Sequence, residues 1–310
     1  MGMSVFVIMF WLSHATAFVP FVGRRLGASK GLQPVRLAAE TFNGANVQAT
    51  LAKYRARVDS LASISPDVPE ITRLRFALAF ETQAEASAAL QDTVAWRKGA
   101  GRSIVEKAAE AVAKATAGGG WDNEPVASAA PHAAVINNFI TSKSILSLST
   151  DAGDLLYVIR AGSIDDRAMM DKVSVPQLVE FFLYVKEVHS LVANARSLST
   201  GRLCGVVFAN DITGIRNIPD KRFSKALSSS SEQYEKLYPS MAGQTMILNL
   251  PFILQAFVGL FKPLFPKSVQ ARLIFTSAPV LAKLKTLTPL TTEPNTRKAF
   301  LAEINKLLRA

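Results

Sequence analysis

The fold is decided by Tyr238–Thr276, which reads YPSMAGQTMILNLPFILQAFVGLFKPLFPKSVQARLIFT. Within it, Thr245–Asn249 is a short apolar run that follows a glycine, which is typical of a buried strand. Pro251 suits the first turn of a helix, and a later proline ends that helix near Lys262. Leu273–Thr276 reads as a second buried strand. The stretch therefore predicts a strand, a helix and a strand in succession.

The predicted helix 251–262 is apolar on almost every side. Only Gln255 and Lys262 form a polar line along it, and a helix of this kind is buried on most sides or is in contact with lipid. Its apolar run spans about 12 residues, whereas a membrane span needs ~20, so we do not expect a transmembrane helix. Two interpretations remain. The helix belongs to the core, or it covers a lipid ligand on its inner side and meets a bilayer on its outer side.

The order of features in this stretch is similar to that of the CRAL-TRIO lipid-transfer family. It contains Tyr-Pro, a glycine, a strand, Asn-x-Pro, an apolar helix, Lys-Pro, a basic residue and a second strand. Arg75–Phe80, followed by Ala89-Leu90 and Val94–Arg97, resembles the small N-terminal helical module of that family. Asp211–Ile215, which closes the apolar run Cys204–Ala209, resembles its Asp-x-x-Gly strand end. The resemblance covers roughly residues 70–290.

The resemblance implies an α/β fold in which a mixed, mainly parallel sheet flanked by helices follows a small all-helical module. It also implies that helix 251–262 is a gate over a lipid pocket. The implied pocket and gate residues are Val206, Phe208, Phe252, Leu254, Phe257, Val258 and Phe261. The implied headgroup or membrane contacts are Ser240, Lys262, Lys267 and Arg272. Among these, Arg272 stands where phosphoinositide-binding members carry a basic residue.

The chain departs from the phospholipid-binding pattern at several of these positions. Ser240 stands where an acidic residue is expected after Tyr-Pro, and Val269 stands where a hydroxyl is expected before Arg272. Val206 and Phe208 replace two hydroxyl residues that hold a choline phospholipid in the family. These changes favour a prenyl lipid, a sterol-like lipid or a galactolipid over phosphatidylinositol and phosphatidylcholine. A phospholipid is kept as an alternative ligand.

Residues 1–39 are typical of a targeting presequence. Val5–Leu12 is an apolar core, and Ala15–Ala17 is a small-x-small cleavage site. Phe18–Ala39 contains basic but no acidic residues, which is the composition of a transit peptide. Together these segments resemble the two-part plastid presequence of algae with secondary plastids, and plain secretion is the alternative. The single cysteine, Cys204, allows no disulfide in the chain and therefore fits a reducing plastid stroma.

The chain divides into four predicted parts. They are the presequence (1–39), a helical module (40–120), a linker (121–143) and a CRAL-TRIO-like domain (144–310). The module is predicted to hold helices over 46–64, 70–80, 82–97 and 102–117, before a triglycine. The later parts are predicted to hold a short helix over 133–140, strands over 145–149, 155–160 and 203–209, and helices over 176–198, 219–237, from about 278, and over 295–308.

The charge pattern indicates a membrane surface as a partner. The net charge is +11, and every charged residue between Lys236 and Thr292 is basic. These residues stand among phenylalanines and leucines, and no nucleic-acid-binding motif accompanies them. An anionic bilayer attracts such residues by ~1 kcal/mol for each Lys or Arg near its surface. We expect a monomer that contacts lipid and an anionic membrane, and no nucleic acid.

The sequence offers poor candidates for catalysis. His14 falls in the presequence, His132 in the linker, and His189 on a helix stripe typical of a core or pocket-lining position. Cys204 opens a buried strand without an evident partner base. Nucleophile, metal and dinucleotide motifs are absent, and the carboxylates Asp165, Asp166 and Asp171 are typical of a solvated loop. We therefore expect no enzyme, metal or cofactor. Two function classes remain: a lipid-transfer protein, and a lipid-gated interaction module that lacks transfer activity of its own.

Overall fold

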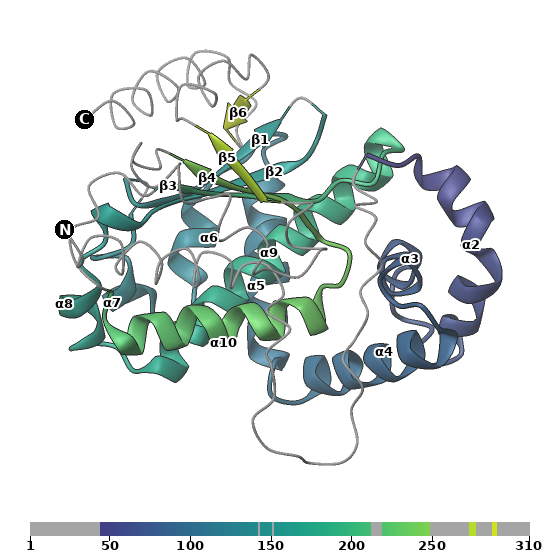
Figure 1. Ribbon diagram of the computed structural model, residues 1–310, viewed down its shortest axis with the longest axis horizontal. Helices are drawn as coiled ribbons and strands as arrows, with labels where there is room; N and C mark the ends of the chain where they lie inside the picture. Colours follow the sequence, from purple (N-terminus) through teal and green to yellow (C-terminus); the bar gives the residue numbers. More distant parts are fainter. Residues whose placement is uncertain are drawn as a thin grey trace.

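The computed structural model describes residues 44–141, 143–150, 152–211, 219–248, 273–276 and 287–289. These residues form a small helical region and a mixed sheet with long helices packed along it (Figure 1). The presequence, the predicted gate helix 251–262 and the predicted helices after residue 277 lie outside the described residues.

The N-terminal helical region lies beside one end of the sheet (Figure 1). It consists of α2 (Val47–Ala62), α3 (Glu70–Ala79) and α4 (Gln83–Lys98). Capping residues fix the helix starts: the Asn46 side chain accepts the Ala49 N–H at 2.9 Å, and Thr82 with Glu85 forms a capping box. The core of this region includes Val58, Leu61, Leu74, Phe76 and Leu90, together with Leu203 from the sheet region.

The fourth predicted helix, α5 (Arg102–Thr116), packs differently from its neighbours in sequence. The sequence groups it with the helical module. In the structure, its buried residues Ile104, Ala108 and Ala111 join the core beneath the sheet. Its small alanine face allows it to lie close along a second helix there.

The sheet has the strand order β5-β4-β3-β2-β1-β6. Its strands are β1 (Ile145–Thr150), β2 (Leu155–Arg160), β3 (Val206–Asp211), β4 (Ala242–Leu248), β5 (Leu273–Thr276) and β6 (Leu287–Pro289). Strands β2, β3, β4 and β5 run parallel, whereas β1 is antiparallel to both of its neighbours. The predicted fold class, a mixed and mainly parallel sheet behind a helical region, is confirmed.

Two long helices pack against the same face of this sheet as α5 (Figure 1). They are α9 (Val175–Thr200) and α10 (Lys221–Leu237). Helix α9 connects β2 to β3, and α10 connects β3 to β4, so both crossovers advance in one direction across the sheet. Right-handed crossovers that advance in one direction place their helices on one face.

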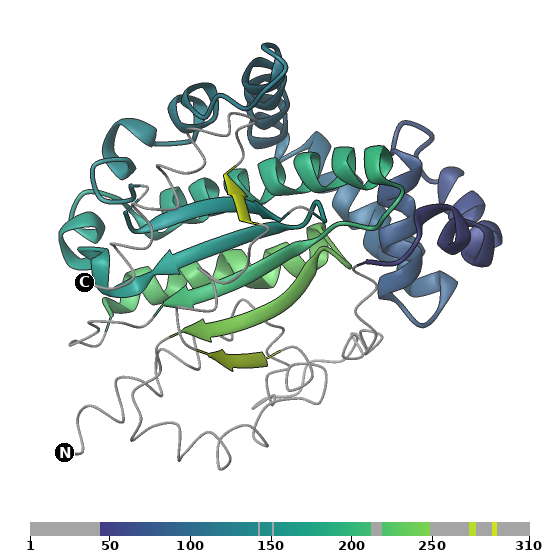
Figure 2. The same cartoon turned by 90° about the horizontal axis from the view of Figure 1, so that it is seen from above.

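Shorter elements close the ends of this core. They are α6 (Glu124–Ala129), α7 (Ala133–Ile136), the 3-10 helix η2 (Ala161–Ser163) and α8 (Asp166–Met170). The predicted linker therefore contains two short helices, and its residues Ala130, Ile136 and Ile140 are buried in the core of the sheet region. Figure 2 shows α9 and α10 running lengthwise along the strands.

Several predicted elements agree with the structure, and the strands β3 and β6 depart from the prediction. The predicted strands 145–149 and 155–160 are confirmed and pair as the antiparallel hairpin of β1 and β2, and α9 begins at a capping box of Ser174 with Gln177. The central strand β3 begins at Val206 rather than Leu203, because Leu203 instead pairs through its backbone with residues 44 and 45 and buries its side chain in the helical region. Strand β6 was not expected; it adds an antiparallel edge to β1.

Candidate functional site: the apolar face of the sheet

Side chains along the strands alternate between two faces, and the two faces differ in their surroundings. One face packs on α5, α9 and α10 and carries Leu155, Tyr157, Ile159, Val206 and Phe208. The opposite face, which we call the apolar face, carries Leu146, Leu148, Leu156, Val158, Val207, Ala209, Met246 and Leu248. The helices described above do not contribute to this second cluster. The apolar face is therefore a separate hydrophobic layer, extending over four adjacent strands.

A buried ion pair lies at one edge of the apolar face. By the same alternation, Arg160 follows Leu156 and Val158 on β2, and Asp211 follows Val207 and Ala209 on β3. The two residues are register partners at the carboxyl ends of their strands, and Arg160 Nε lies 3.3 Å from Asp211 Oδ2. Their side chains are 12% and 1% exposed.

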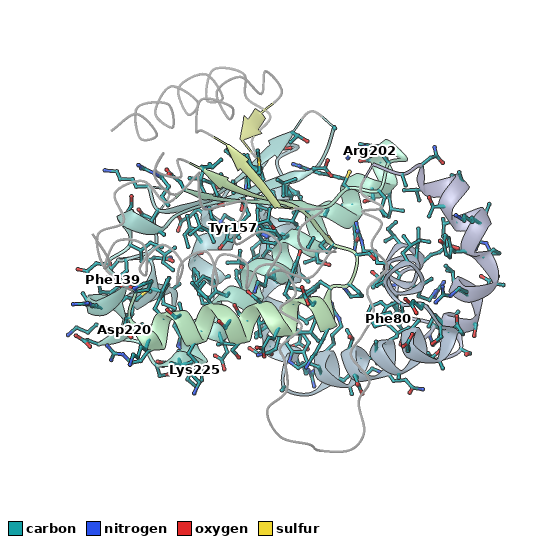
Figure 3. All side chains as sticks on the ribbon, viewed as in Figure 1. Phe80, Phe139, Tyr157, Arg202, Asp220 and Lys225 are labelled. Atoms are coloured by element: carbon teal, nitrogen blue, oxygen red, sulfur yellow. The ribbon has the colours of Figure 1, made fainter. Side chains whose placement is uncertain are left out.

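Val206 and Phe208, which the resemblance implies to be pocket residues, lie on the face that the helices cover. Both are buried, and the Phe208 ring contacts the edges of Tyr157 and Tyr234. Figure 3 shows Tyr157 on the helix side of the sheet. Because side chains alternate along a strand, it is the neighbouring residues Val207 and Ala209 that lie on the apolar face.

The helix-covered face also holds polar groups that the sequence places on α9. His189 and Ser147 are joined by a hydrogen bond of 2.7 Å, and Lys186 donates to Ser230 at 3.1 Å. Burial lowers the pKa of His189 to about 3, with the charge of Lys186 acting in the same direction. Burial also lowers the pKa of Lys186 well below its usual value. His189 is a neutral residue of the core, which is the first of the two positions that the sequence allowed.

Ser240 lies at the opposite end of the sheet from Arg160 and Asp211, in the turn between α10 and β4. It is half-buried with a positive φ of 53°, and its carbonyl accepts a hydrogen bond from Arg75 at 2.8 Å. The remaining predicted site residues lie outside the described residues: Phe252, Leu254, Phe257, Val258, Phe261, Lys262, Lys267 and Arg272.

Arg75 joins the helical region to this end of the sheet. Its guanidinium, buried within α3, donates to Asn194 Oδ1 at 2.7 Å, Ser240 O at 2.8 Å, Cys204 O at 2.6 Å and Ser197 Oγ at 3.3 Å. Burial lowers its pKa to about 10, so the group remains charged at neutral pH.

A second connection runs from α4 to Glu187 on α9, and from Glu187 to Tyr238 at the end of α10. Arg97 and Glu187 form two hydrogen bonds of 2.8 Å each, and the Tyr238 hydroxyl donates to Glu187 at 2.8 Å. Burial lowers the pKa of Arg97, but its hydrogen bonds to Glu187 and the charge of that carboxylate raise it more. Arg75, Arg97 and Tyr238 stand out in the sequence, and Ser240 and Cys204 do so for other reasons, but the partners Glu187, Asn194 and Ser197 do not.

The sheet, its crossover helices and the separate apolar layer define an α/β domain whose sheet has a second buried hydrophobic face, distinct from the one on these helices. Residues 141–292 match the CRAL/TRIO domain family. This part of the chain, 152 of its 310 residues, is therefore similar to the CRAL/TRIO domain.

Comparison with solved structures gives a match to the crystal structure of Sfh5, with 13% sequence identity and a TM-score of 0.40. The match covers 72% of this chain, which spans 65% of the length of that one. No curated protein matches the sequence.

Within the described ranges, no helix is long and apolar enough to cross a membrane. The same ranges contain no cluster of His, Cys, Asp and Glu suited to a metal ion.

Proposed function

We propose that this protein binds a lipid with a long hydrocarbon chain against the apolar face and carries it between membranes. The observation that supports this most directly is the composition of that face, where eight apolar side chains from β1 to β4 form a layer separate from the helix-covered core. Ligand pockets are lined mainly by such side chains, with few polar groups.

The energetics of exchange suit a carrier. Each methylene removed from water contributes ~0.8 kcal/mol, and a bilayer removes the same methylenes from water. Exchange between membrane and protein is therefore close to thermoneutral, and the barrier lies in opening the site and desorbing the lipid. In this proposal, helix 251–262 is the gate, with Phe252, Leu254, Phe257, Val258 and Phe261 on the lipid. Ser240, Lys262, Lys267 and Arg272 are proposed to contact a headgroup or an anionic bilayer.

The alternative is a module that presents its lipid to another protein without transferring it. Both functions require bound lipid, so the first experiment is mass spectrometry of lipid extracted from the purified chain. We expect a prenyl, sterol-like or galactolipid ligand, with phospholipid as the alternative. A carrier moves this lipid between donor and acceptor vesicles unaided. A presenting module retains it, and that result would replace the transfer proposal.

Ala209 provides a direct test of where the lipid lies. It is buried on the apolar face between Val158 and Met246, its register partners on the neighbouring strands. In Ala209→Phe the new ring would occupy the position proposed for the lipid, so we expect loss of most of the co-purifying lipid with a Tm close to that of the wild type. Lipid per protein, by mass spectrometry, and Tm are the two measurements.

Val206→Phe is the matched control for Ala209→Phe. Val206 is equally buried on the same strand but faces α9 and α10. Overpacking a closed core costs ~1–3 kcal/mol, so this variant should lose stability and keep its lipid. If Ala209→Phe also loses stability while retaining lipid, the apolar face is closed core and the proposed site is wrong.

The proposed location is the plastid of an alga with secondary plastids. Residues 1–45 fused to a fluorescent protein should enter the plastid of an algal host, because the fusion contains both the apolar segment and the acid-free basic segment. Phe18→Ala, at the junction of the two segments, should divert the fusion to the secretory route. Fluorescence microscopy distinguishes these outcomes. Secretion of both fusions would establish the alternative.

A further inference from the structure

We propose that the helix-covered side of the sheet contains an internal binding site for ordered water, located between β3 and α10 and held by Asn210 and Ser231. The site lies on the opposite face of the sheet from the proposed lipid, so it does not depend on the proposed function. The groups that meet there are short, uncharged hydrogen-bonding side chains in a buried part of the molecule, and water is the ligand that suits them.

Three buried polar side chains on this side have no hydrogen-bond partner within the described part of the chain. Asn210, Ser224 and Ser231 are each 3% exposed, and the atoms concerned are Asn210 Nδ2, Ser224 Oγ and Ser231 Oγ. In folded proteins, roughly nine-tenths or more of buried polar groups are paired with protein or with ordered water, because burying one unpaired is costly. A partner other than protein is therefore expected for these atoms.

Asn210 faces α10. It follows Val206 and Phe208 on β3, and side chains two residues apart share one face of a strand, so Asn210 lies on the helix-covered face. Helix α10 connects the parallel neighbours β3 and β4 and therefore runs back along them (Figure 2). The rings of Phe208 and Tyr234 meet with centroids 5.9 Å apart, which fixes the level of the helix against the strand.

Measured from this ring contact, Asn210 and Ser231 lie at a similar level. Asn210 is two residues beyond Phe208, or ~7 Å toward the carboxyl edge of the sheet at 3.3 Å per residue. Ser231 is three residues before Tyr234, or ~4.5 Å in the same direction at 1.5 Å per residue. Both side chains are shorter than the rings beside them, so in this proposal water spans the distance between the strand and the helix.

The preceding serine of α10 shows what a hydroxyl paired by protein looks like. Ser230 Oγ accepts from Lys186 Nζ at 3.1 Å and donates to Leu227 O at 3.0 Å. Ser231 is one residue further, turned by ~100° around the helix, and therefore faces a different side of α10 from the contact with Lys186. A water that accepts from Asn210 Nδ2 and bonds the Ser231 hydroxyl would satisfy both groups. Ser224, two turns earlier on the same side as Ser231, provides a second position for water.

A crystal structure of the purified chain that resolves ordered water tests the site directly. We expect an electron-density peak within hydrogen-bond distance, about 2.7–3.2 Å, of both Asn210 Nδ2 and Ser231 Oγ. A direct hydrogen bond between the two side chains would overturn the proposal, and so would a well-resolved map without a peak between them.

Thermal unfolding supplies a second readout, with controls on the same helix. Ser231→Ala removes one of the two groups that hold the water, so we expect the Tm to fall by about 2–4 °C. Ser228→Ala, at a half-buried position on another side of α10, measures the gain in helix propensity alone and should leave the Tm equal or slightly higher. Ser230→Ala removes a hydroxyl that protein groups already pair and should lower the Tm whether or not water is bound.

The comparison of Ser231→Ala with Ser228→Ala decides between a hydrated and a dry site. If the Ser231 hydroxyl were buried without any partner, its removal would relieve a cost of folding, and the Tm of Ser231→Ala would equal or exceed that of Ser228→Ala. That result would overturn the water site. A Tm below that of Ser228→Ala, together with the density peak, would establish it.

Discussion

Replacing Arg75 by methionine is expected to lower the free energy of unfolding by at least ~3 kcal/mol, because each buried acceptor left without a donor costs ~1–3 kcal/mol. Arg75 donates to the buried carbonyl of Cys204, to the carbonyl of the half-buried Ser240 and to the Asn194 side chain. Methionine fills similar space but donates to none of them. Urea unfolding measures the change, with the m-value as a check that the native state is unchanged.

Arg73→Met is the matched control on the same helix. Arg73 is half-buried and donates to Val68 O within the helical region, so its loss should cost only ~1 kcal/mol, the net contribution of one hydrogen bond. Arg75→Lys should recover part of the stability, since an ammonium keeps the charge but cannot reach acceptors in several directions from a planar fork. A cost for Arg75→Met no larger than that for Arg73→Met would show that the helical region does not depend on this residue for its docking.

The elements whose boundaries were predicted well are those that local signals define. Asn46, Thr82 and Ser174 begin helices because their side chains accept backbone N–H groups at the first turn. The β1–β2 hairpin follows from two apolar runs around a glycine turn. The start of β3 was misplaced because Leu203 is apolar for a different reason: its side chain belongs to the core of the helical region.

The assignment of residues to the two sheet faces could not be made from local signals. Alternation places Val206 with Phe208 and Val207 with Ala209, but both sets are apolar, so composition does not say which set meets the helices. That depends on the direction of the crossovers, which is a property of the whole sheet. Arg160 was detectable in principle, as a charge ending an otherwise apolar strand. Its partner Asp211 was seen only as a strand end.

Arg97 and Glu187 should show a strong asymmetry when each is replaced by methionine. Glu187 is 1% exposed, so Arg97→Met leaves a carboxylate buried with Tyr238 as its remaining partner. Removing one member of a buried pair in this way costs ~3–5 kcal/mol. Arg97 is 33% exposed, so in Glu187→Met the guanidinium can turn toward water. We therefore expect a smaller loss of ~1–2 kcal/mol, close to that of its hydrogen bonds.

The double variant, Arg97→Met with Glu187→Met, separates the interaction energy of the pair from the cost of leaving one buried charge without its partner. With both groups replaced, no buried charge remains, so the double variant should be more stable than Arg97→Met alone. Urea unfolding of all four proteins gives the coupling energy. Arg102→Met is the control, because its 2.7 Å pair with Glu106 is exposed on α5 and such pairs contribute less than ~1 kcal/mol. Equal losses in Arg97→Met and Glu187→Met would mean that Glu187 reaches water once its partner is gone, and that α4 is not held to α9 by a buried charge.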